Sequence, residues 1–293
     1  MHRGGLLLAI VSLSACHRNV EANQGPTLAA TPLSVDGAQT TDPAAMRAHG
    51  ERLSHVLGCR GCHRQTLQGQ LFNVDAPELG KIYASNLTRA VPTMTDAQLE
   101  SLLRTGQHTV RRDLWIMPSQ IFQRLSAADM AALIAYLRTL KPAGPPTPAP
   151  SFAAPGRAEI AAGKMKPAVA YVAEYKALLP PDLGPGHAFG RYLASVTCSE
   201  CHGRDLSGSP DPEPKFATPN LDIAGAYSEA ELARLISTGE GKTSRDLGLM
   251  AAVGKANFAH FTPHERSAIV GYIKARAARL PDFLDRRDRL RHM

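Results

Sequence analysis

The sequence contains one unit twice, and this duplication constrains the fold more than any other feature. The stretch LGCRGCH at residues 57–63 recurs as VTCSECH at residues 196–202. Three further stretches match: CHRQTLQG (62–69) with CHGRDLSG (201–208), MTDAQLESLLRTG (94–106) with YSEAELARLISTG (227–239), and RRDLWIMP (111–118) with SRDLGLMA (244–251). The chain of 293 residues therefore carries two copies of one small domain.

Both copies show the signals of short helices. Thr95 and Ser228 begin equivalent helices with capping boxes, and Gly106 and Gly239 provide the C-terminal stops. The last helix of each copy carries an apolar stripe at helical spacing. No convincing alternating β pattern appears, so the sequence predicts an all-α fold of two tandem domains.

Composition divides the chain further. The predicted domains cover residues 44–142 and 184–283, followed by a basic tail at 284–293. Residues 143–183 form a Pro- and Ala-rich linker, whose first part, AGPPTPAPSFAAPG, is expected to be an extended spacer. Its later part, residues 157–179, has partly helical character, and we expect it to influence how the domains are oriented.

The first fifteen residues have the pattern of an export signal. Their apolar run of about ten residues is shorter than the roughly 20 that span a bilayer. The ending LSAC resembles the bacterial lipobox, which implies that residues 1–15 are removed and Cys16 is acylated. Residues 16–43 are predicted to be a flexible tether. We expect a protein anchored by lipid at the periplasmic face of a bacterial membrane. The outer membrane is favoured because the residue after Cys16 is His17, whereas an aspartate there would resemble an inner-membrane retention signal.

The four remaining cysteines are Cys59, Cys62, Cys198 and Cys201. A zinc site would need four ligands, but each copy supplies only two thiolates and one histidine. A dithiol redox pair is typical of a βαβ setting, which is not visible here, and leaves the histidine without a role. Attachment of c-type haem explains every position. Two thiols one turn apart reach the haem vinyl groups, and the next residue presents an imidazole to the iron. The sequence thus predicts two covalently bound haems.

Each copy resembles a class I cytochrome c domain, over residues 44–141 and 184–280. The shared residues are the C-x-x-C-H motif, the Leu and Gly that follow it, and a methionine before a terminal helix that carries Tyr. The resemblance implies a helical fold wrapped around a haem, with His and Met as axial ligands.

The resemblance also implies which residues bind iron. His63 and His202 are expected as proximal ligands, and Met117 and Met250 as distal ligands. The second copy departs from the family pattern, because Ala251 stands where a proline follows the first methionine. The alternatives are Met94 and His108 in the first copy and His260 in the second, whereas Met130 lies on an apolar stripe and is expected in the core.

These ligands favour electron transfer over catalysis at the iron. Methionine raises the potential relative to a second histidine and fills the sixth position. The expected function is a relay of single electrons in a periplasmic respiratory or dehydrogenase-linked chain, and no catalytic residue is predicted. The alternative is a haem enzyme, such as a dihaem peroxidase-like protein with one labile sixth ligand, for which the Met250 region is the candidate.

The net charge of the chain indicates which kinds of partner it can bind. The chain has 33 basic and 26 acidic side chains, a net charge of +7. We expect redox protein partners (a dehydrogenase, an oxidase or another cytochrome) with an acidic docking surface. Nucleic acid is not expected, because no basic run is interleaved with aromatic residues. Arg112 and Arg245 precede the two methionines at equivalent places and are candidates to pair with haem propionates.

Overall fold

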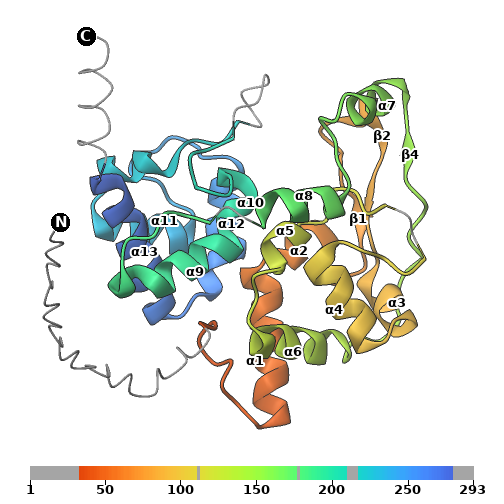
Figure 1. Ribbon diagram of the computed structural model, residues 1–293, viewed down its shortest axis with the longest axis horizontal. Coiled ribbons are helices and arrows are strands. Elements are labelled where there is room, and N and C mark those ends of the chain that lie inside the picture. Colours follow the sequence, from red (N-terminus) through yellow and green to blue (C-terminus); the bar gives the residue numbers. More distant parts are fainter. Residues whose placement is uncertain (1–32, 111–112, 177–178, 210–216, 280–293) are drawn as a thin grey trace, which may run out of the picture. The chain divides into compact units, whose positions relative to one another are not determined.

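The computed structural model describes residues 33–110, 113–176, 179–209 and 217–279 (Figure 1). The predicted signal peptide, Cys16, Arg112 and the basic tail lie outside these ranges. Within them, no helix is both long enough and apolar enough to span a bilayer.

Helices dominate both copies, which confirms the all-α class. The first domain contains α1 (Pro43–Val56), α2 (Cys59–His63), η1 (Pro77–Leu79), α3 (Leu87–Ala90), η2 (Val91–Thr93), α4 (Asp96–Thr105), α5 (Ser119–Phe122) and α6 (Ala127–Leu137). The linker contains α7 (Ala154–Ala161) and α8 (Ala168–Tyr175). The second domain contains η3 (Pro185–His187), α9 (Ala188–Thr197), α10 (Ser199–His202), η4 (Leu221–Ala226), α11 (Glu229–Thr238), α12 (Leu249–Ala256), η5 (Phe258–His260) and α13 (Pro263–Ala278).

Two small antiparallel ribbons accompany the helices of the first domain and the linker. Strand β1 (Gln70–Leu71) pairs with β3 (Tyr83–Ala84), and β2 (Gly80–Lys81) pairs with β4 (Ser151–Phe152). Each strand has only two residues, too short to produce the alternation by which a strand is recognised in sequence.

The predicted helix ends are confirmed in both copies. Thr95 and Ser228 each accept a hydrogen bond from the backbone three residues later, and a side chain returns the bond to complete the capping box. Gly106 and Gly239 then adopt left-handed backbone conformations, with φ of 71° and 79°. The duplicated sequence therefore encodes the same local geometry twice.

In each domain, the helix before the C-x-x-C-H motif packs on the last helix, so α1 lies against α6 and α9 against α13. The backbones meet at a glycine that the sequence analysis did not single out. A Cβ atom on Gly50 would lie 1.9 Å from the carbonyl oxygen of Ala132, and one on Gly190 would lie 2.1 Å from that of Ala268. Only glycine permits this approach.

Substitution of Gly190 by alanine is therefore expected to destabilise the second domain by about 1–3 kcal/mol, because the helices must separate. Gly271 in α13 provides the control, since a Cβ there meets nothing within 4 Å. Its replacement by alanine should stabilise the helix by about 0.5–1 kcal/mol. Thermal denaturation of both variants measures the difference, and equal melting temperatures would contradict the close crossing.

The linker is hydrogen-bonded to the first domain along much of its length. The Asn86 side-chain amide donates to the carbonyl oxygens of Ala143 and Pro145 at 2.8 and 2.9 Å. Further along, the backbone N–H of Ala168 donates to the carbonyl of Leu114 at 2.8 Å, and α8 packs on α5. Proline removes donors but keeps carbonyl acceptors, and the first domain bonds to these carbonyls.

The end of the predicted tether is also packed. Residues 33–38, which we call the strap, precede α1, and Val35 and Ala38 within it are only 1% and 7% exposed. The expectation of flexibility fails here because backbone amides of the strap bond to two buried carboxylates, described below. Residues 16–32 of the predicted tether lie outside the described ranges.

The two domains contact each other through equivalent elements. Helix α1 of the first domain lies against η5 of the second, and α9 of the second lies against α5 of the first. At the first of these contacts the rings of His55 and His260 stack, with centroids 3.9 Å apart.

Acidification is expected to weaken this contact. Burial, with the charges of Arg60 and His260, lowers the pKa of His55 to about 4; burial, Arg60 and Arg52 lower that of His260. A depressed pKa means that the packed state favours the neutral ring. The stabilising contribution is complete above the ordinary value of 6.5 and is lost as the pH falls toward about 4. Small-angle scattering should show domain separation over this range. His55→Asn should shift the transition to lower pH, and an unchanged profile would refute the role of the stack.

Candidate functional site

The first C-x-x-C-H motif forms the short helix α2, which begins after Gly58 in a left-handed conformation with φ of 75°. The His63 ring is buried, and its Nδ1 lies 2.6 Å from the carbonyl oxygen of Ser85. A carbonyl only accepts, so Nδ1 carries the proton and Nε2 keeps its lone pair for a ligand. Burial lowers the pKa of His63, which also favours the neutral, ligating form.

The second motif is built in the same way. Nδ1 of His202 lies 2.8 Å from the carbonyl oxygen of Pro219. Burial again lowers the histidine pKa, although the bond to this carbonyl acts in the opposite direction. Neither carbonyl partner was predicted from the sequence. A signal was present, because Asn86-Leu87 and Asn220-Leu221 follow them directly and match each other.

The loops after the two motifs share an unusual conformation. Leu67 and Leu206, the matched leucines of the sequence comparison, are fully buried and have φ of 58° and 66°. A leucine with positive φ is strained and persists only where its surroundings hold it. The amides of Gly69 and Gly208 close each loop onto the carbonyl of the motif histidine, at 3.0 and 2.8 Å. This repeated loop fixes the backbone of both histidines.

A cavity opens beside α2 in the first domain. Its volume is about 1230 Å³, counted with the space at its mouth, and Cys59, Cys62 and His63 form part of its wall. Apolar and aromatic side chains supply much of the rest, including Phe72, Leu99, Leu102, Trp115, Phe122 and Leu133. The cavity therefore suits a large, mostly apolar group that is held by a few polar atoms.

The thiols are poorly suited to reactions that need a thiolate. Burial is the largest cause in each case, and raises the pKa of Cys59 to about 12 and those of Cys62, Cys198 and Cys201 to about 11. Zinc binding and disulfide exchange both use the thiolate. None of these four cysteines is paired in a disulfide. In the part of the chain that the structure describes, no group of three or more His, Cys, Asp or Glu residues is arranged to hold a metal ion.

Three candidate distal ligands line the cavity with His63: Met117, Met94 and His108. Met117 follows Ile116, a β-branched residue at φ of 66°, which is a strained conformation of the kind found at functional sites. Met94 is 8% exposed and belongs to the packed core. Met130 is also in the core, at 1% exposed. The cavity thus brings Met117 and His63 together, with Met94 and His108 as competitors in the same wall.

The second domain places its candidates differently. Met250 lies in the first turn of α12 and is partly buried against the core, whereas its counterpart precedes a helix. His260 stacks on His55 at the domain contact. Arg245 is exposed.

Comparison with known proteins finds the same family in both copies of the repeated unit. A family model described as Cytochrome c matches residues 47–141 and again residues 188–277, which together exceed half of the chain. A search of curated proteins found no match. Each matched range contains one C-x-x-C-H motif.

Proposed function

The chain belongs to the cytochrome c family, and we propose that it relays single electrons between redox proteins through two haems, each with one histidine and one methionine ligand. Two domains of this family imply two covalently bound c-type haems and a role in electron transfer. One observation supports the proposed histidine and methionine ligands. Two cysteines, a histidine with a fixed ring and Met117 all line the same apolar cavity.

The residues of the first site fit a haem. Cys59 and Cys62 line the cavity one helical turn apart, as two thioether bonds to one macrocycle require. The carbonyl of Ser85 fixes His63 in the tautomer whose Nε2 can bind iron. The bound haem supplies the iron whose oxidation state changes by one electron.

The chain's own residues determine how that iron behaves. The hydrogen bond from His63 to Ser85 orients the ring and increases its basicity. The soft thioether of Met117 favours ferrous iron and so raises the potential. The apolar wall limits water. With His63 and Met117 both bound, the iron would have no position for oxygen or peroxide, and the site would exchange electrons without binding a substrate.

For the second site, we propose His202 and Met250 as the ligands. The bond from His202 to Pro219 supports the first assignment, since it repeats the geometry of His63. The alignment of RDLGLM with RDLWIM supports the second. Arg112 and Arg245 remain candidate partners for the propionates.

The cellular location of the protein is also part of the proposal. The apolar run and the LSAC ending support export, acylation of Cys16 and attachment at the periplasmic face of a bacterial membrane, with the outer membrane favoured. The net charge of +7 supports docking to redox proteins that present an acidic surface.

A redox titration with haem-resolved spectra tests the proposal. The purified protein should contain two haems, and its oxidised form should show the weak near-infrared band of Met–iron charge transfer at an intensity for both. The reduced protein should not bind carbon monoxide. Carbon monoxide binding together with turnover of peroxide would favour the peroxidase-like enzyme instead, and absence of the near-infrared band from both domains would refute the ligand assignment.

A further inference from the structure

Two carboxylates are completely buried where the domains meet. Asp129 and Glu265 are both 0% exposed, and they occupy the same place in the two copies, the third residue of α6 and of α13. A buried carboxylate is costly unless hydrogen bonds and opposite charges compensate it. Glu265 completes a capping box with Thr262. Asp129 instead accepts from the Ser126 hydroxyl at 2.8 Å, which leaves acceptor capacity for other donors.

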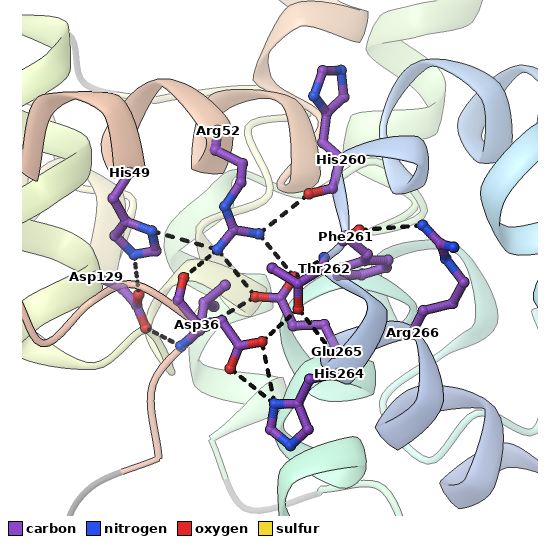
Figure 2. A network of polar contacts seen from close by, with 11 residues as sticks. Asp36, His49, Arg52, Asp129, His260, Phe261, Thr262, His264, Glu265 and Arg266 are labelled. Atoms are coloured by element: carbon purple, nitrogen blue, oxygen red, sulfur yellow. Dashed lines mark hydrogen bonds and ion pairs between the residues drawn. The ribbon is translucent and has the colours of Figure 1, made fainter. Parts of the chain in front are cut away.

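Each carboxylate receives a donor from the opposite domain. The guanidinium of Arg52, on α1, donates to both Glu265 oxygens at 2.8 and 3.0 Å (Figure 2). The hydroxyl of Tyr192, on α9, donates to Asp129 at 3.0 Å. Arg52 lies two residues after Gly50, and Tyr192 lies two residues after Gly190, so the two donors are equivalent in the repeat. The contact thus pairs equivalent positions reciprocally, as in a two-fold symmetric dimer.

The strap joins the two carboxylates. Consecutive backbone amides donate to them, Val35 to Asp129 at 3.0 Å and Asp36 to Glu265 at 2.9 Å. Figure 2 shows Asp36 between Asp129 and Glu265, with its carboxylate directed at Thr262 and His264. Burial raises the pKa of this carboxyl, but hydrogen bonds from these two residues, with the charges of His264 and Arg52, outweigh burial and lower the pKa overall.

The same contact places the second C-x-x-C-H motif beside the Met117 segment of the first domain. The Gln120 side chain, three residues after Met117, donates to Glu200 of α10 at 2.7 Å, and helices α5 and α10 touch. The second C-x-x-C-H motif therefore lies across the domain contact from the segment of the first domain that follows Met117.

We propose that Asp129, Glu265, their donors Arg52 and Tyr192, and the strap form a clamp that positions the two domains for direct electron transfer between their haems. The proposal rests on the electron relay described above and adds the residues that set its internal step. That step moves one electron from the ferrous iron of one domain to the ferric iron of the other, with no bond made or broken. Because the rate of electron transfer falls steeply with distance, a loosened contact slows it even when both haem sites are intact.

The test is the rate of electron transfer between the haems after photochemical injection of one electron into the oxidised protein. In Arg52→Leu combined with Tyr192→Phe, each carboxylate loses its donor from the other domain. We expect the equilibrium constant for docking to fall at least about tenfold and the rate to fall with it. The midpoint potentials and Met–iron bands of the separate haems should stay nearly unchanged, which a general loss of structure would not allow.

Three further variants sharpen the result. Arg52→Lys retains the charge and should recover part of the rate. Arg191→Leu is the matched control on α9, because this arginine bonds to Pro180 and Asp182 of the linker, and it should leave the rate unchanged. Val35→Pro removes one strap amide outside both haem sites, and should slow the rate even if the double variant does not fold.

An unchanged rate in the double variant and in Val35→Pro would overturn the clamp. So would a slower rate accompanied by altered Met–iron bands, since the effect would then arise within a haem site. A protein whose haems fail to take up or release electrons at all would instead contradict the proposed relay, and reductive titration recognises that case independently.

Discussion

Replacing Cys59 and Cys62 by alanine together is expected to remove covalent haem from the first domain and to leave that domain largely unfolded, while the second domain keeps its haem. The short helices of this domain pack around a mostly apolar cavity, and such a cavity without the group that fills it is strongly destabilising. Haem staining after denaturing electrophoresis should fall to about half per chain, and helical circular dichroism should decrease.

The equivalent double substitution of Cys198 and Cys201 is the matched comparison, and should produce the complementary loss. His63→Ala keeps both thiols, so it should retain covalent haem but change its spectrum. A double cysteine variant that keeps full helical content without haem would contradict the view that the haem completes the core.

The sequence was sufficient for features encoded over short distances. The C-x-x-C-H motif, the capping boxes at Thr95 and Ser228, and the helix ends at Gly106 and Gly239 each depend on residues within about one or two helical turns. The duplication strengthened each of them, since the same local signal occurred twice. For this reason the fold class and the presence of two covalently bound haems were predicted correctly, whereas the assignment of individual attachment residues stays a prediction.

Features formed between distant residues were not predictable in the same way. Asp129 was not singled out from the sequence. It bonds to His49 at 2.9 Å and to Val35 and Tyr192, which lie 94 and 63 positions away. Glu265 and Arg52 are 213 positions apart. Such pairs leave no periodic pattern, and a strap whose backbone amides supply the bonds resembles any polar tether in composition.

Replacing Met117 by leucine is the second change with a large expected effect. Leucine has a similar volume but no sulfur, so the first iron should lose its sixth ligand with little change in packing. Since axial ligands tune haem potentials over about 0.8 V, the potential of this haem should fall markedly while that of the second haem changes little. The near-infrared Met–iron band should lose about half its intensity, and the reduced first haem should bind carbon monoxide.

Other side chains of the first domain make this experiment decisive. Met130→Leu is the same chemical change in the core, where the side chain is 1% exposed, and should alter neither potential nor band. Met94→Leu and His108→Ala change the two competitors in the cavity wall, and should leave the band in place. If either abolishes the first-domain signal and Met117→Leu does not, the ligand assignment is wrong. Met250→Leu applies the same measurement to the second domain, where a methionine on the first turn of α12 has a weaker sequence precedent because no proline follows it.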